Sequence, residues 1–64
     1  METYLRPYVQ TYRFDGSEIS STTVHAISLE DTREVLRMIP DAAYAVLRDE
    51  RGHYCLRARA SEAY

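Results

Sequence analysis

Residues 28–40 read SLEDTREVLRMIP, and this stretch decides the fold because it marks both ends of a short helix. The Ser28 hydroxyl is placed to accept the backbone N–H of Asp31, while the Asp31 carboxylate reaches back in a variant of the capping box. Negative charge in these first turns also suits the helix dipole. Pro40 disfavours helical geometry at the residue before it. We therefore predict a helix over residues 28–39.

Four apolar residues recur at helical spacing within this segment and predict one apolar stripe. They are Leu29, Val35, Leu36 and Ile39. A stripe of this width must pack against another element, so we expect the flanking segments to supply a sheet.

The segment before the helix predicts a β-hairpin. Strand-forming residues run from Tyr8 to Phe14, and Asp15-Gly16 is a strong signal for a hairpin turn. A second run, residues 19–27, is rich in Ser, Thr, Val and Ile, and its hydroxyl side chains favour an exposed face. Pro7 restricts its own position to an edge strand or a strand start. Alternation on the first strand puts Tyr8, Tyr12 and Phe14 on one face and Val9, Thr11 and Arg13 on the other.

The segment after the helix allows two structures. Residues 42–50 have good helix propensity, with Gly52 as a cap. A hairpin is favoured instead, because residues 44–48 and 54–59 flank the polar tip Asp49–Gly52 and the second arm alternates with period 2. That alternation puts Tyr54, Leu56, Ala58 and Ala60 on one face.

These elements predict an α+β fold in one domain over residues 1–64, with the order β-β-α-β-β and one helix across a small antiparallel sheet. A chain of this length has a small core. Cys55 is its single cysteine, so an intrachain disulfide is impossible. A partner protein or a second copy of the chain is the expected supplement.

The composition favours binding over catalysis. The chain has no Lys, Asn or Trp, and it carries eight Arg and six Tyr. Tyr and Arg dominate the energetic centres of protein interfaces, and about half of the Tyr residues are expected in the core. Cys55 with His25 or His53 lacks a third orienting group, and His53 with Cys55 lacks two further zinc ligands. We expect no catalytic residue, no cofactor and no metal site.

Two surfaces are candidates for partner binding. Acidic residues crowd the helix start and the second hairpin tip, at Glu30, Asp31, Glu34, Asp49 and Glu50. If the tip folds beside the helix, they form one negative patch that imitates DNA and fits a basic host surface. The alternative surface consists of Tyr12, Arg13, Arg57 and Arg59, as a protein-binding patch or a stacking platform for single strands. The net charge of −2 argues against nucleic acid as the partner.

Nothing in the sequence predicts export or membrane insertion. The segment Met1–Pro7 has no apolar core and no cleavage site of a signal peptide, and no uncharged stretch is long enough to cross a membrane. An unpaired thiol fits a reducing compartment. We expect a cytoplasmic protein, in the host cytoplasm if a phage encodes it.

In size, acidity and element order the chain resembles small phage-encoded inhibitors of host defence, of which anti-CRISPR proteins are the best-known group. The hairpin at Asp15-Gly16, the helix opened at Ser28 and the closing pair around Gly52 carry this resemblance. It implies non-enzymatic, stoichiometric binding to a nucleic-acid-handling host complex, and it assigns no site residue. The alternative is a homodimeric antitoxin or a small transcriptional regulator that contacts nucleic acid through Arg57 and Arg59.

Overall fold

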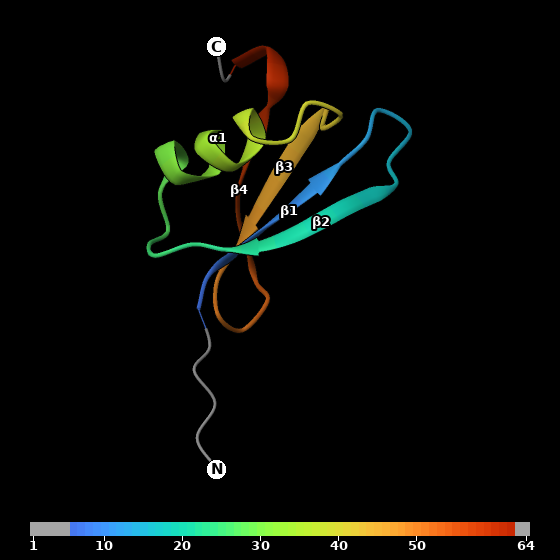
Figure 1. Cartoon of the computed structure of the whole chain (residues 1–64). Coiled ribbons are helices and arrows are strands. Elements are labelled where there is room, and N and C mark those ends of the chain that lie inside the picture. The colour runs from blue at the N-terminus through green and yellow to red at the C-terminus, as the bar shows by residue number, and fades with distance from the viewer. Residues whose placement is uncertain (1–5, 63–64) are drawn as a thin grey trace.

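The computed structural model describes residues 6–62 and has the predicted α+β fold (Figure 1). The elements are β1 (Tyr8–Tyr12), β2 (Glu18–Thr23), α1 (Leu29–Arg37), β3 (Tyr44–Arg48), β4 (Tyr54–Arg59) and the 3-10 helix η1 (Ala60–Glu62). The order β-β-α-β-β is therefore confirmed, and the segment after the helix forms a hairpin, not a second helix. No helix among the described residues is long and apolar enough to span a membrane.

The strands form one antiparallel sheet in the order β2-β1-β3-β4. β1 and β3 occupy the centre, because β1 pairs with both β2 and β3. Pro7 therefore lies at the start of a central strand rather than on an edge. Proline has no backbone N–H to donate. Its carbonyl oxygen accepts a hydrogen bond from the Val24 backbone N–H at 2.9 Å.

Helix α1 begins as predicted and ends earlier than predicted. The Ser28 hydroxyl accepts the Asp31 N–H at 2.9 Å, which confirms the cap. The hydrogen bonds of residues 6–62 do not include the return bond from the Asp31 carboxylate. Helical bonding tightens at Met38, whose N–H lies 3.2 Å from the Glu34 carbonyl and 3.1 Å from that of Val35. Such three-residue bonds close a helix, two residues before the predicted end at residue 39.

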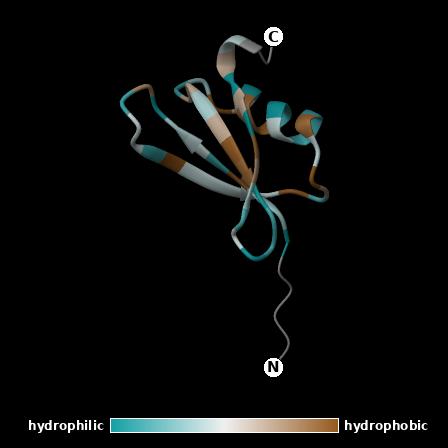
Figure 2. Cartoon of the chain, turned by 180° about the vertical axis from the view of Figure 1, so that it is seen from behind, coloured by the Kyte–Doolittle hydropathy of each residue, from teal (hydrophilic) through white to brown (hydrophobic). Residues whose placement is uncertain are grey.

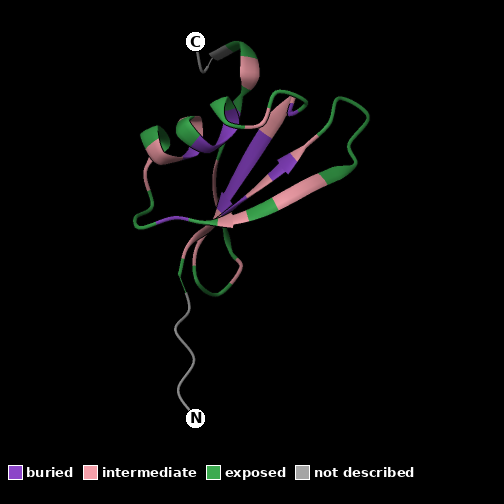
Figure 3. Cartoon of the chain, in the orientation of Figure 1, coloured by how far each residue is buried: buried purple, intermediate pink, exposed green. Residues whose placement is uncertain are grey.

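The core lies between α1 and one face of the sheet, and α1 packs mainly against β3 and β4. Figure 3 shows the buried residues on β1, on β3 and on the side of α1 that faces them. The hydrophobic residues follow the buried ones: β3 is largely hydrophobic and the β3–β4 turn is largely hydrophilic (Figure 2). The buried apolar residues are Val9, Val24, Val35, Leu36, Ala42, Ala45, Val46, Leu47 and Ala58.

The predicted apolar stripe is wrong at its first residue. Leu29 is 41% exposed, because it is the first residue of α1 and this end of the helix extends past the strands (Figure 1). Thr32 is fully buried on the stripe instead. Its hydroxyl donates to the Ser28 carbonyl oxygen at 3.0 Å, and a satisfied hydroxyl is inexpensive to bury.

Leu36→Ala should lower the free energy of unfolding by about 2–5 kcal/mol, the range for a buried leucine replaced by alanine. Leu36 is 1% exposed and is among the largest fully buried side chains of the described chain. Chemical denaturation at constant m-value measures the change. Leu29→Ala is the matched control and should cost far less, since the sheet does not cover Leu29. Equal losses for the two variants would contradict the packing.

Candidate functional site

The sheet face opposite α1 has no second layer of structure over it within residues 6–62. Side chains alternate along each strand and cross-strand partners share a face. Since Val9, Leu47 and Ala58 lie under the helix, their strand neighbours point the other way. This set, which we call the open face, comprises Tyr8, Gln10, Tyr12, Glu18, Ser21, Thr23, Tyr44, Val46, Arg48, Tyr54, Arg57 and Arg59.

Cross-strand register arranges the open face in rows. Tyr44 pairs with Tyr12 on one side and with Arg59 on the other, and Val46 pairs with Arg57 in the next row. The rings of Tyr12 and Tyr44 are stacked, with centroids 5.1 Å apart and planes inclined by 12°. Such a pair holds both rings in a fixed orientation. The register thus places aromatic rings on β1 and β3 beside the arginines of β4.

Hydrogen bonds fix the centre of this face. The Gln10 side-chain oxygen accepts from Arg48 Nε at 2.7 Å and from the Tyr12 hydroxyl at 3.2 Å. Arg48 Nη1 also donates to the Gly52 carbonyl oxygen at 3.1 Å. Because both ends of this network are anchored, the Tyr12 ring and the Arg48 guanidinium are held in place before any ligand binds.

A bulge moves Tyr54 onto the open face, although alternation alone predicts it beside Leu56 on the helix side. The pairing shifts between Leu47, which faces Leu56, and Arg48, which faces Tyr54. Cys55 is the extra residue, and such an insertion reverses the side to which the preceding residue points. Tyr54 is consequently 60% exposed.

The tyrosines do not fill the core as predicted. The four that the structure describes, Tyr8, Tyr12, Tyr44 and Tyr54, all belong to the open face and are half-buried or exposed. Tyr4 and Tyr64 lie outside the described residues. The core takes small and branched side chains instead, since the space between one short helix and the sheet is thin.

The structure brings together three residues of the predicted alternative surface. Tyr12, Arg57 and Arg59 share the open face, while Arg13 lies in the β1–β2 turn and donates to the Ser17 hydroxyl at 3.3 Å. Sequence reasoning did not assign Gln10, Tyr44, Arg48 or Tyr54 to this surface. The missing signal was the β1–β3 register, because it joins strands that a whole helix separates in the sequence.

The acidic residues of α1 lie on the other layer. Glu30 pairs with Arg37 at 3.4 Å on the exposed side of the helix. Asp31 and Glu34 line a groove of about 240 Å³ between α1 and the segment after β2, where His25 also contributes. Both acids are therefore directed toward the β2 side of the helix.

The acids of the second hairpin tip form a separate group. Figure 1 shows the β3–β4 turn beyond the end of the sheet that lies away from α1. Asp49 Oδ1 accepts the backbone N–H of His53 at 2.8 Å and that of Arg51 at 2.9 Å. The His53 bond, followed by the Arg51 bond, holds the pKa of Asp49 below its usual value. The Asp49 carboxylate thus organises its own turn, with Glu50 exposed beside it.

Acid should loosen the β3–β4 turn. A carboxyl whose pKa is lowered by folding stabilises the folded state above its ordinary pKa, and this stabilisation is lost as the pH falls through the lowered value. The amide proton shifts of Arg51 and His53, followed by NMR, should move with that titration. In Asp49→Asn they should not, since the amide oxygen still accepts but does not ionise. Identical acid titrations in the two proteins would contradict this role.

Cys55 and the two histidines do not assemble a reactive group. The Cys55 thiol lies 3.6 Å from the His53 carbonyl oxygen, and the His53 ring faces Asp49 at 3.6 Å from Nδ1 to Oδ2. His25 Nδ1 lies 3.4 Å from Arg6. Across residues 6–62, no three His, Cys, Asp or Glu side chains gather as ligands for a metal ion.

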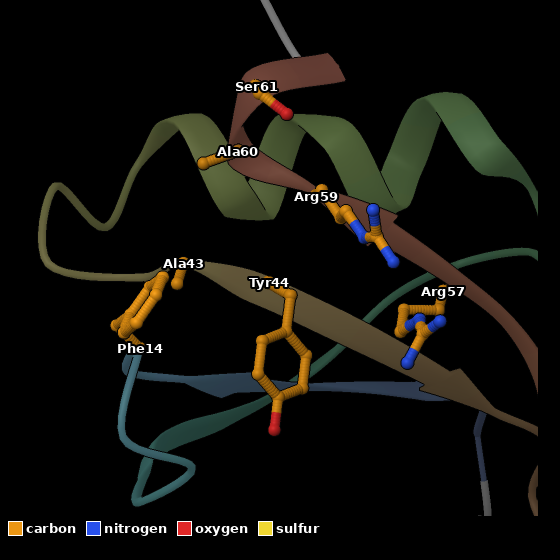
Figure 4. A pocket seen from close by; sticks show the side chains of 7 residues that line it. All are labelled: Phe14, Ala43, Tyr44, Arg57, Arg59, Ala60 and Ser61. Carbon is orange, nitrogen blue, oxygen red and sulfur yellow. The ribbon is translucent and has the colours of Figure 1, made fainter.

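A cavity of about 580 Å³ lies where the open face meets the β1–β2 turn and η1. We call it the end pocket. Its lining residues are Phe14, Ala43, Tyr44, Arg57, Arg59, Ala60 and Ser61. Figure 4 shows the Tyr44 ring between Phe14 on one side and the guanidinium groups of Arg57 and Arg59 on the other. The pocket therefore combines aromatic and cationic walls.

Comparison of this chain with protein-family models, with curated proteins and with solved structures found no match.

Proposed function

We propose that this domain is a non-enzymatic binding module for single-stranded nucleic acid, and that the open face is its binding surface. The observation that supports this most is the cross-strand register, which sets tyrosine rings directly beside arginines on one uncovered sheet face. Aromatic rings stack on unpaired bases and arginines contact phosphates, so a sheet that presents both is suited to a single strand.

The net charge does not describe this face. Arg48, Arg57 and Arg59 lie on it. Its one acid, Glu18, lies on β2, at the sheet edge opposite β4, and the acids of α1 lie on the opposite layer. Exposed charges are screened over about 10 Å at 0.1 M salt. A phosphate at the open face therefore interacts mainly with the arginines, and the expectation against nucleic acid, which rests on the sum of all charges, loses its force.

A single strand fits this surface better than a duplex. The open face presents tyrosine side chains on an uncovered side of the sheet, and the bases of a duplex are already stacked on one another. Binding to phosphates makes log K fall as log salt rises, with an expected slope of about −0.7 for each phosphate that is neutralised on a single strand. We expect stacking to supply most of the affinity.

The DNA-mimic form of the inhibitor hypothesis needs its five acidic residues in one patch. The structure separates Glu30, Asp31 and Glu34 from the β3–β4 turn, and Asp49 is occupied by that turn. Mimicry of DNA and a phage origin therefore stay predictions. The second hypothesis, contact with nucleic acid through Arg57 and Arg59, agrees better with the geometry, and its homodimer also stays a prediction.

Fluorescence anisotropy with a dye-labelled oligothymidine of about 10 nucleotides, within the usual site size for sheet-based binders, tests the function. Tyr54→Ala should weaken binding by about fivefold or more, since one stacked base contributes ~1–3 kcal/mol. Arg57→Gln should weaken it and make the salt slope shallower by ~0.7. Both residues are exposed, so neither change should alter the unfolding midpoint much.

Arg37→Gln is the matched control, because it removes the same charge from the opposite layer. It should bind the oligonucleotide almost as well as wild type, and a hairpin duplex should bind more weakly than the single strand. Absence of binding at low salt would overturn the proposal, as would equal losses for Arg57→Gln and Arg37→Gln. Either result would leave a protein partner as the better explanation for the open face.

A further inference from the structure

We propose that the end pocket binds one nucleotide, with the base against Phe14 and Tyr44 and the phosphate at Arg57. This inference rests on the proposed function in one respect, namely that the nucleotide is the last one of a bound strand. The pocket chemistry itself is independent of that function and is tested separately below.

The size and walls of the pocket suit this ligand. About 580 Å³ lies within the range of small-molecule sites. Phe14 and Tyr44 give apolar ring surface at one side, and the guanidinium of Arg57 lies at the other (Figure 4). A nucleotide has the same division, with a flat aromatic base at one end and an anionic phosphate at the other.

Phe14 has no structural reason to be aromatic. It is 95% exposed in the β1–β2 turn, so it contributes almost nothing to the core. A single exposed apolar residue is common. Phe14, however, is also a wall of a cavity whose far side is cationic, and a base stacked on the ring would bury apolar surface that folding leaves in water.

Arg57 supplies the anion-binding group. Its planar guanidinium can donate two parallel hydrogen bonds to one phosphate, with more geometric selectivity than an ammonium group. Its cross-strand partner is the buried Val46, and the Arg57 side chain lines the pocket (Figure 4). The Ser61 hydroxyl in the same lining offers a further polar contact for the sugar or phosphate.

The pocket lies at an end of the open face rather than at its middle. Tyr44 belongs to the last pair of both the β1–β3 and β3–β4 ladders at this end, and η1 follows directly after Arg59. A strand that runs over the open face reaches the pocket as it leaves the sheet. The bound group is therefore either the terminal nucleotide of a strand or a free nucleotide, and both present an aromatic base and an anionic phosphate.

Titration of the isotope-labelled full chain by NMR with adenosine 5′-monophosphate, adenosine and inorganic phosphate tests the pocket. The mononucleotide should bind at least about tenfold more tightly than either adenosine or phosphate alone. Adenosine lacks the ionic contact with Arg57, and phosphate lacks the stacked base. Phe14→Ala and Arg57→Gln should each weaken it severalfold. Tyr54→Ala is the control and should leave it unchanged, since Tyr54 lies at the other end of β4. Equal binding of the three ligands, or no effect of Phe14→Ala, would overturn the inference.

A comparison of linear and circular oligothymidines of the same length tests whether the pocket binds the terminal nucleotide of a strand or a free nucleotide. Tighter binding of the linear form, with the preference lost in Phe14→Ala, supports recognition of a strand end. Equal binding of both forms overturns the strand-end assignment. Binding of the mononucleotide without binding of either oligonucleotide would overturn the single-strand function while it supports the pocket as a free-nucleotide site.

Discussion

Burial of Val35 and Leu36 of α1 against the sheet is the interaction on which the rest of the structure depends. One short helix can cover one face only, so the sheet has a packed side and a side without a second layer in the described chain. Val46 belongs to that second side, yet it is only 8% exposed. Its cover therefore comes from the side chains of the sheet itself. Tyrosine and arginine suit this task, because each has a long apolar body and a polar end that stays in water.

This structural role is a complete explanation for some residues of the open face and an incomplete one for others. Tyr12, Tyr44 and Arg48 are half-buried and are tied by a ring stack and by hydrogen bonds through Gln10, so the fold alone accounts for them. Tyr54 and Phe14 are different, because at 60% and 95% exposure they cover little of the protein. Folding gains almost nothing from these two rings. These two exposed rings therefore support binding in addition to the cross-strand register, which sets Tyr44 beside Arg59.

Local rules predicted the elements well because each element carries its own signal. Asp15-Gly16 makes the first turn, Ser28 caps the helix, and period-2 alternation marks β4. Errors appear where a non-local contact decides. Leu29 has the right spacing for the apolar stripe but lies past the sheet. The bulge in β4 places the Tyr54 side chain on the sheet face opposite to the one that alternation predicts. The grouping of Tyr12 with Tyr44 depends on the β1–β3 pairing, which no local pattern encodes. The two groups of acidic residues are apart for the same reason, since they are adjacent only if the hairpin tip folds beside the helix.

Tyr44 connects the ordered centre of the open face to the end pocket. One of its contacts is the stack on Tyr12, and it also lines the pocket between Phe14 and Arg57. The hydrogen bond from Tyr12 to Gln10 extends this connection to Arg48 at the other end of β3. A ligand in the pocket therefore contacts a ring whose orientation is fixed by the same network that holds the rest of the face. Such preorganisation lowers the entropy cost of binding, and it makes the pocket and the open face one continuous surface rather than two independent sites.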